Sequence, residues 1–382
     1  MSQPDWANKK RLVKIAFLVR ALNYGGAQSQ LVSLAQELKK RGHTICVIAF
    51  YNGIHARELS AAGIKVHLLN KRSRWDVVGF LWRLTRLIRD ESPDILYGYL
   101  ATCNLLTGWL KFFSRHTKAV WGVRVSDLNL HYYDWLARCL AWLELKFSGV
   151  AALVIANSEA GKHYALSQGW KPKNFVVIHN GIEVNKFQPN IEARKKIRAE
   201  WNVADDELLI GIVGRIDPIK EHRIFLQAAA QLIPVLANVR FVCVGDAAHK
   251  DYQKQLLALT EALGLQQKVI WAAARYDLPA VYNGLDVLTN CSSSEGFSNV
   301  IGEAMACGIS CVVTDVGDSA EIVGDTGIVV EANNPTALVT GWLECLRRDR
   351  QAMGRQARQR ISEMFSVQKM VDETEAVLLA LT

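Results

Sequence analysis

One stretch, EGFSNVIGEAMACG from Glu295 to Gly308, constrains the fold of this 382-residue chain more than any other. The apolar run 285–289 before it predicts a buried parallel strand. After Gly296, apolar residues recur at helical spacing until Gly308 ends the pattern. A strand, a loop and a helix in this order form the repeating unit of an α/β domain with a parallel sheet.

Two carboxylates accompany this predicted helix: Glu295 lies in the loop before it, and Glu303 lies about two turns inside it. A helix N-terminus carries partial positive charge, so its free N–H groups can bind a phosphate. Each carboxylate can accept hydrogen bonds from a pair of sugar hydroxyls. The pattern therefore suits a nucleotide sugar, and the alternative is two solvated glutamates. The other expected donor-binding residues of this stretch are Gly296, Phe297, Ser298 and Asn299.

The spacing Glu295-x7-Glu303 resembles the signature of the family-4 retaining glycosyltransferases, which have the GT-B fold. The resemblance implies that Glu295 faces the donor sugar and that Glu303 holds the ribose. It also implies the fold class: two Rossmann-like, doubly wound α/β domains that face each other across a cleft.

A second informative stretch is GIVGRIDPIK at 211–220. Asp217 suits a helix N-cap, which places Lys220 in the first turn of the following helix, while Arg215 follows the end of a strand. Two fixed cations can bind a diphosphate and stabilise its charge as it leaves. In the resembled family, the Arg and Lys at these positions bind the donor pyrophosphate. The alternative is a pair of solvated surface cations.

The nucleobase site has a weaker sequence signal. Segment 271–275 lies where the resembled family holds the base, largely through backbone groups, and Arg275 is included among the expected donor-binding residues. We favour a UDP-sugar donor, with a GDP-sugar next. Since the chain has no Asp-x-Asp triplet, we expect a metal-independent enzyme, with no metal ligand and no cofactor.

The first domain is expected to open with a strand over 12–19 and a helix over 27–40, joined by a turn that contains Gly25 and Gly26. This is not the GxGxxG pattern, so a dinucleotide fingerprint is absent. A tight turn and close approach of a ligand are both open for the two glycines. The resemblance implies approach to donor phosphate and acceptor.

The resembled family commonly has a histidine at or just after the strand expected at 95–99. Tyr97, Tyr99 and Thr102 stand there instead. We take Tyr99 as the catalytic candidate of this domain, and the alternative is a packing residue with a satisfied hydroxyl.

A further candidate, Arg124, ends the strand expected over 118–124. With Ser126 and Asp127 it is expected at the sheet edge where α/β domains bind ligands. The alternative is a surface salt bridge.

Charge is unevenly distributed along the chain. Residues 1–180 contain 25 Lys and Arg against 11 Asp and Glu, so this part has a net charge of +14 and the remainder −6, within a total of +8. Region 71–89 combines basic residues with tryptophans, which predicts docking on anionic lipid. The alternative is a packed helix with a basic solvent face. Without a recognisable binding module, nucleic acid is not an expected partner.

The eight cysteines form no CxxC pair, and no apolar run approaches the roughly 18 residues that span a bilayer. We therefore expect reduced thiols and a cytoplasmic protein, with peripheral association at the inner face of the membrane as a further hypothesis.

Four segments are expected. They are an N-terminal, acceptor-side Rossmann-like domain at 1–185, a linker with a short helix at 186–205, a C-terminal nucleotide-sugar-binding Rossmann-like domain at 206–365 and a helix crossing back to the N-terminal domain at 366–382.

Together these features predict a retaining glycosyltransferase that moves a hexose-type sugar from a nucleoside-diphosphate donor to a hydroxyl acceptor, such as a lipid-linked or polysaccharide precursor. Two alternatives stay open. One is a GT-B-fold sugar-nucleotide epimerase or phosphorylase. The other is a non-catalytic sugar-nucleotide-binding subunit, which the missing histidine motivates.

Overall fold

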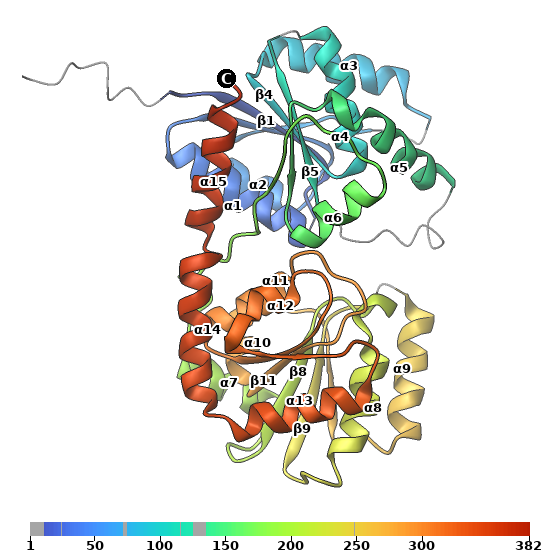
Figure 1. The fold of residues 1–382 in the computed structure, drawn as a ribbon, viewed down its shortest axis with the longest axis vertical. Helices are drawn as coiled ribbons and strands as arrows, with labels where there is room; N and C mark the ends of the chain where they lie inside the picture. Colours follow the sequence, from blue (N-terminus) through green and yellow to red (C-terminus); the bar gives the residue numbers. More distant parts are fainter. Residues whose placement is uncertain (1–10, 24, 72–74, 115, 125–134, 248) are drawn as a thin grey trace, which may run out of the picture. The chain divides into compact units, whose positions relative to one another are not determined.

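The computed structural model describes residues 11–23, 25–71, 75–114, 116–124, 135–247 and 249–382. The chain divides into two compact units, drawn in Figure 1. Unit 1 comprises Met1–Gly181 and Val367–Thr382, and unit 2 comprises Ile182–Ser366. Each unit is a parallel sheet covered by helices, so the prediction of two Rossmann-like α/β domains is confirmed.

Unit 1 contains a seven-stranded parallel sheet in the order β3-β2-β1-β4-β5-β6-β7. The strands are β1 (Lys14–Ala21), β2 (Thr44–Tyr51), β3 (Lys65–Leu68), β4 (Ile95–Tyr99), β5 (Lys118–Val123), β6 (Leu153–Ala156) and β7 (Phe175–Val177). The order reverses between β1 and β4, and such a switch point is where doubly wound sheets bind ligands, beyond the carboxyl ends of the strands.

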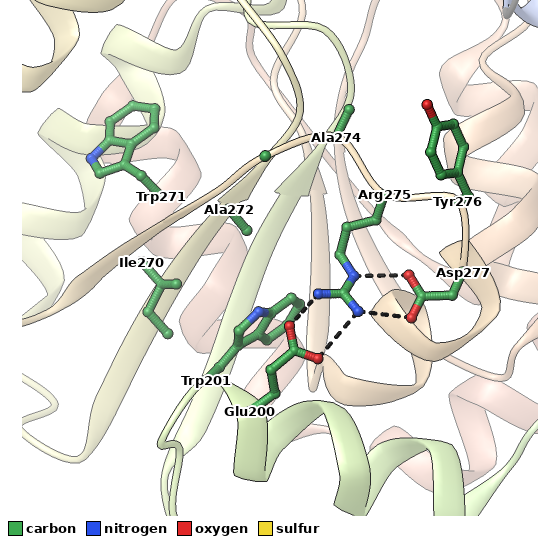
Figure 2. Close-up of a pocket in the computed structure, with 10 residues that line it drawn as sticks. Glu200, Trp201, Ile270, Trp271, Ala272, Ala274, Arg275, Tyr276 and Asp277 are labelled. Atoms are coloured by element: carbon green, nitrogen blue, oxygen red, sulfur yellow. Dashed lines mark hydrogen bonds and ion pairs between the residues drawn. The ribbon is translucent and has the colours of Figure 1, made fainter.

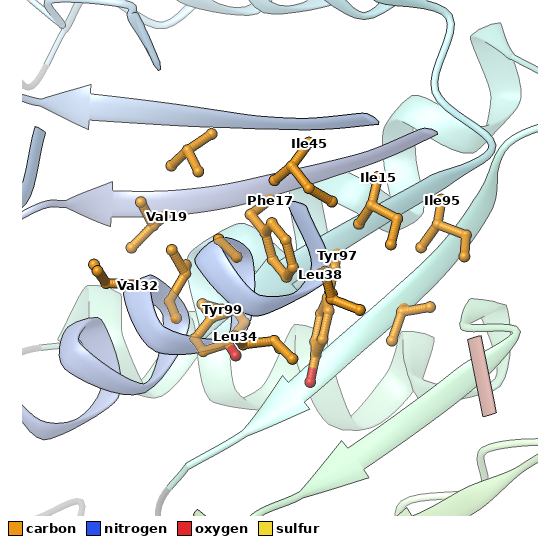
Figure 3. Close-up of a cluster of buried hydrophobic side chains, with 14 of the residues drawn as sticks. Ile15, Phe17, Val19, Val32, Leu34, Leu38, Ile45, Ile95, Tyr97 and Tyr99 are labelled. Carbon is orange, nitrogen blue, oxygen red and sulfur yellow. The ribbon is translucent and has the colours of Figure 1, made fainter. Parts of the chain in front are cut away.

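Helices cover both faces of this sheet, which explains why its strands are nearly continuous apolar runs. They are α1 (Gly26–Lys40), α2 (His55–Ala61), α3 (Val78–Glu91), α4 (Ala101–Leu110), α5 (Trp135–Phe147), α6 (Glu159–Ser167) and α15 (Val367–Leu379), with short 3₁₀ turns η2 (Lys111–Phe113) and η4 (Ser148–Val150). Figure 3 shows Phe17, Tyr97 and Tyr99 among the aliphatic side chains of one buried cluster. Val371 of α15 belongs to the same cluster, and His43 contacts Glu375 of α15 at 2.8 Å.

Unit 2 contains a six-stranded parallel sheet in the order β10-β9-β8-β11-β12-β13, and its switch point lies between β8 and β11. The strands are β8 (Leu208–Val213), β9 (Val239–Val244), β10 (Val269–Ala272), β11 (Val287–Asn290), β12 (Ser310–Thr314) and β13 (Ile328–Val330). The helices are α7 (Ile191–Glu200), α8 (His222–Leu232), α9 (Lys250–Ala262), α10 (Leu278–Gly284), α11 (Asn299–Ala306), α12 (Ser319–Val323), α13 (Pro335–Arg347) and α14 (Arg350–Met364), with 3₁₀ turns η5 (Pro218–Lys220) and η6 (Gly324–Thr326).

Two segments differ from the sequence expectation. Residues 186–205, expected as a linker with a short helix, contain α7 and are part of unit 2. Arg198 of α7 is only 1% exposed and bonds Asp286 Oδ2 at 3.1 Å, so this segment is anchored to the sheet. The helix expected over 218–236 is interrupted, because Glu221 adopts the left-handed conformation at φ 52° and separates η5 from α8.

Within the described ranges, no helix has both the length and the apolar character that crossing a bilayer requires.

Candidate active site

The loops that follow β8 and β11 meet at the switch point of unit 2, and they contain most of the residues expected to bind the donor. The Ser293 backbone N–H donates to the Ile219 carbonyl at 2.9 Å, which ties the second loop to η5. Two stretches 75 residues apart in sequence thereby form one surface at the carboxyl ends of the strands.

Lys220 and Glu295 form the charged centre of this surface. Their side chains are 26% and 11% exposed, and the Lys220 ammonium donates to Glu295 Oε1. The same oxygen accepts from Ser292 Oγ at 2.7 Å and from Asn290 Nδ2 at 3.4 Å. These donors stabilise an ionised carboxylate in a fixed position, as a group that must orient a sugar requires.

The N-terminus of α11 lies directly after this carboxylate. Its N-cap residue, Ser298, makes no capping bond through its side chain, because Ser298 Oγ accepts instead from Asn290 Nδ2 at 2.8 Å. Phe297 is buried with its ring 5.4 Å from the Phe365 ring. Any contribution of Phe297 to a ligand must therefore come from its backbone.

A neighbouring loop fixes the backbone before α11. Asp318 N donates to the Gly296 carbonyl at 3.1 Å, and Gly317 has φ 57°, where a β-carbon would overlap the Glu295 carbonyl. Only glycine permits this approach.

Glu303 is the second carboxylate of the stretch. Burial raises its pKa to about 7, while the Tyr282 hydroxyl donates to Glu303 Oε2 at 2.6 Å. Burial also raises the pKa of Tyr282 well above its ordinary value, so this phenol stays a donor. The tyrosine leaves acceptor capacity on the carboxylate, which suits hydroxyl recognition.

Arg215 does not join Lys220 in one ion-pair cluster. Its side chain is 67% exposed, and its Nη2 lies 3.0 Å from Asp217 Oδ2. Asp217 also acts as the predicted N-cap, accepting from Ile219 N at 3.2 Å. Arg215 is therefore accessible to an anion, whereas Lys220 already has a carboxylate partner.

Arg275 lines a cavity of about 600 Å³ beside the end of β10 (Figure 2). Its guanidinium lies between two carboxylates. It donates to both oxygens of Asp277 at 2.8 Å and to both oxygens of Glu200. These bonds raise the pKa of Arg275, and all three of its guanidinium nitrogens donate to a carboxylate. Its side chain therefore forms part of the cavity wall.

In unit 1, Gly25 and Gly26 form the junction of β1 and α1, and the Gly25 carbonyl accepts from Ser29 N at 2.9 Å. Tyr99 is 1% exposed, and its hydroxyl accepts from Arg124 at 3.1 Å. Thr102 lies in the first turn of α4. The two other residues expected beside Arg124, Ser126 and Asp127, lie outside the described residues.

Sequence reasoning missed the groups that position the two glutamates, namely Asn290, Ser292 and Tyr282. The polar residues at the end of β11 and just after it could have predicted the roles of Asn290 and Ser292. Tyr282 lies on α10, and no sequence motif marks that helix as part of the site. It also missed His222, whose ring nitrogens are buried without a hydrogen-bond partner among the described residues. Burial and the neighbouring Lys220 lower the pKa of His222 to about 4.

Two family models match the chain, one in each half. Residues 24–186 match "Glycosyltransferase Family 4", and residues 207–348 match "Glycosyl transferases group 1". The two matches cover most of both units.

Relatives with similarity over the full length point the same way. The putative glycosyltransferase EpsF of Bacillus subtilis is 22% identical over 92% of this chain and 91% of its own. N-acetyl-alpha-D-glucosaminyl L-malate synthase of Bacillus anthracis is 21% identical over 92% and 93%. The crystal structure of Anabaena Alr3699/HepE in complex with UDP-glucose is similar in fold, with a TM-score of 0.86, 24% identity and coverage of 96% and 100%.

Proposed function

Because the chain is a GT-B-type glycosyltransferase and belongs to family 4, we propose that it transfers a hexose-type sugar, with retention, from a nucleoside diphosphate to a hydroxyl acceptor. The observation that best supports this proposal is the Lys220–Glu295 ion pair at the switch point of unit 2, with Glu303 on the helix that follows.

We assign Glu295 to the sugar hydroxyls and Glu303 to the ribose. Lys220 and Arg215 bind the diphosphate and stabilise the charge that grows as the glycosidic bond breaks. The acceptor attacks the anomeric carbon from the face that the diphosphate leaves, and the departing phosphate takes the acceptor proton. This route needs no general base from the chain. It is consistent with the Tyr99 hydroxyl, which already accepts a hydrogen bond from Arg124.

A UDP-sugar is the favoured donor, because the related fold of HepE was solved with UDP-glucose. The cavity beside Ala272 and Arg275 is the proposed place of the base. Since Lys220 and Arg215 can stabilise the charge of the leaving diphosphate, we also propose that turnover needs no metal. Chelation with EDTA should leave the rate unchanged.

The acceptor is proposed to be a lipid-linked or polysaccharide precursor, reached from an anionic membrane surface. A patch on unit 1 supports this. It is called the aromatic–basic patch and consists of Trp82, Arg86, Arg89, Trp109 and Phe113. Arg86 lies 5.6 Å from the Trp82 ring centre, and Arg89 lies 5.9 Å from that of Phe113. Residues 72–74, part of the expected 71–89 region, lie outside the described residues.

Calorimetric titration with UDP, GDP and ADP, without metal, tests the donor site. We expect one nucleotide to bind in the micromolar range and Glu303→Ala to weaken it strongly. The exposed Lys254→Ala is a matched control in the same unit. If no nucleotide binds to the folded protein, the donor-site proposal is wrong. Binding without turnover on any acceptor would favour a non-catalytic subunit, and turnover of free sugar nucleotide without transfer would favour an epimerase.

Flotation with liposomes tests the membrane proposal. The wild type should float with vesicles that contain anionic lipid, and Arg86→Glu with Arg89→Glu should abolish this, while Lys254→Glu should not. Equal flotation of all three proteins, or none, would contradict a role for the aromatic–basic patch.

A further inference from the structure

Arg124 follows the last residue of β5, next to the carboxyl end of β4. Its Nη2 donates to the hydroxyls of Tyr97 and Tyr99, each at 3.1 Å, and its Nη1 lies 3.4 Å from Asn180 Oδ1. The guanidinium carbon is 4.7 Å from the centre of the Tyr99 ring. A cation–π contact and two phenols therefore hold the head group in one place.

These partners supply no negative charge. Burial raises the pKa of both Tyr97 and Tyr99 above their ordinary value, so both phenols are neutral. No carboxylate of the described residues lies within ion-pair distance of Arg124, and its buried Nε–H has no acceptor among them. The surface salt bridge considered from the sequence is therefore not formed with any carboxylate of the described residues, and Asp127 lies outside them.

Other tightly held arginines of the chain behave differently. Arg198 is paired with Asp286, and Arg275 is held by Asp277 and Glu200. A cation that is largely removed from water without a counter-charge is unfavourable, and structural arginines avoid it. An arginine that lacks its anion is therefore a candidate for binding one from outside.

The backbone around Arg124 fits such a site. Leu100, which follows Tyr99, has φ 73° and ψ 161°, a conformation that leucine rarely adopts. Backbone strain of this kind gathers where a side chain must be held for function. Arg124 as a residue is only partly buried, whereas its Nε is buried.

We propose that Arg124 binds an anionic oxygen of the acceptor, either of a phosphate or of a carboxylate group, and so selects an acidic acceptor. This inference rests on the proposed transferase function and deepens it. The donor diphosphate has its own cations, Lys220 and Arg215, in unit 2, whereas Arg124 belongs to unit 1. Tyr97 and Tyr99 are positioning residues that orient the guanidinium.

The test is calorimetric titration of inorganic phosphate, and separately of acetate, into the protein at low salt, with and without saturating UDP. The UDP-saturated wild type should bind one of the two anions, which identifies the group on the acceptor. Arg124→Gln should weaken this binding at least 10-fold, and Arg124→Lys less. Lys118→Gln, which removes an exposed cation at the start of β5, should bind the anion as the wild type does.

Stability separates this role from a structural one. Because no described carboxylate pairs with Arg124, Arg124→Gln should melt at the wild-type temperature or above it, while anion binding is lost. A lower melting temperature together with unchanged anion affinity would overturn the proposal. So would a wild type that binds neither anion. Tyr99→Phe keeps the ring but removes the hydroxyl that accepts from Arg124. It should lower the affinity for the anion several-fold without unfolding the protein.

The UDP titration in the same series keeps the two proposals distinguishable. Arg124→Gln should bind UDP as tightly as the wild type does. Loss of UDP binding in the wild type would contradict the proposed donor site, whereas the anion titration without UDP would still decide the role of Arg124.

Discussion

The two units share a doubly wound topology but differ in the electrostatics of their switch points. In unit 2, the loops that end β8 and β11 present a paired cation and anion, Lys220 and Glu295, with further donors on the carboxylate. In unit 1, the corresponding sheet edge presents Arg124 with two neutral tyrosines. The comparison teaches that the same topology can carry two kinds of site. In one, the cation is neutralised by a carboxylate of the chain, and in the other, the cation has no carboxylate partner among the described residues.

Removing the cation of unit 2 should have the largest effect. Lys220→Ala should lower kcat by about 10²–10³-fold, because a preorganised donor to the leaving group is lost. Glu295 should keep the donors Ser292 and Asn290, so the fold should survive. Steady-state kinetics with Lys254→Ala as control checks this. An unchanged kcat would show that the paired cation of unit 2 has no catalytic role.

The second carboxylate of unit 2 should show a pH-dependent effect on binding. Since the pKa of Glu303 is about 7, UDP affinity should rise as the pH increases from 6 to 8 and the carboxylate ionises. Glu303→Gln should bind roughly 10-fold more weakly at pH 8, about 1.4 kcal/mol. The ratio of wild-type to variant Kd cancels the titration of the nucleotide itself. A ratio that stays flat over this pH range would exclude ionisation of Glu303 as the cause.

Unit 1 has a comparable buried carboxyl, Glu144 on α5, which accepts from Asn104 Nδ2 at 2.6 Å. Burial raises its pKa to about 7, so its stabilising contribution is complete below about pH 4.5 and is lost as the pH rises through 7. Glu144→Gln keeps the acceptor and removes the ionisation. It should raise the free energy of unfolding at pH 8 by on the order of 2 kcal/mol. Urea unfolding at several pH values between 5 and 8 measures this difference. If the free energy of unfolding changes equally with pH in both proteins, the assignment to Glu144 is wrong.

The smallest effect is expected at the break before α8. Glu221→Gly places the residue that tolerates φ 52° there, and should raise the free energy of unfolding by about 0.5–1 kcal/mol. The affinity for UDP should stay unchanged. A destabilised variant would mean that contacts of the Glu221 side chain stabilise the fold by more than the loss of backbone strain does.

The comparison also shows what the sequence could predict. Apolar runs located the strands of both sheets, and the Glu295–Glu303 spacing located the switch point of unit 2, because these signals are local. The tyrosine partners of Arg124 and the Glu200 partner of Arg275 could not be predicted, since the tyrosines lie 25 and 27 positions from Arg124 and Glu200 lies 75 positions from Arg275. The break at Glu221 was missed because a left-handed glutamate leaves no compositional trace.

Helix α15 has a consequence for the order in which the chain can fold. Unit 1 consists of two separate segments, and α15 contributes Val371 and Leu378 to its core. The chain enters and leaves unit 2 side by side, since Ile182 N donates to the Phe365 carbonyl at 2.8 Å. The core of unit 1 can therefore be completed only after residues 367–382, the last part of the chain to be synthesised, have been made.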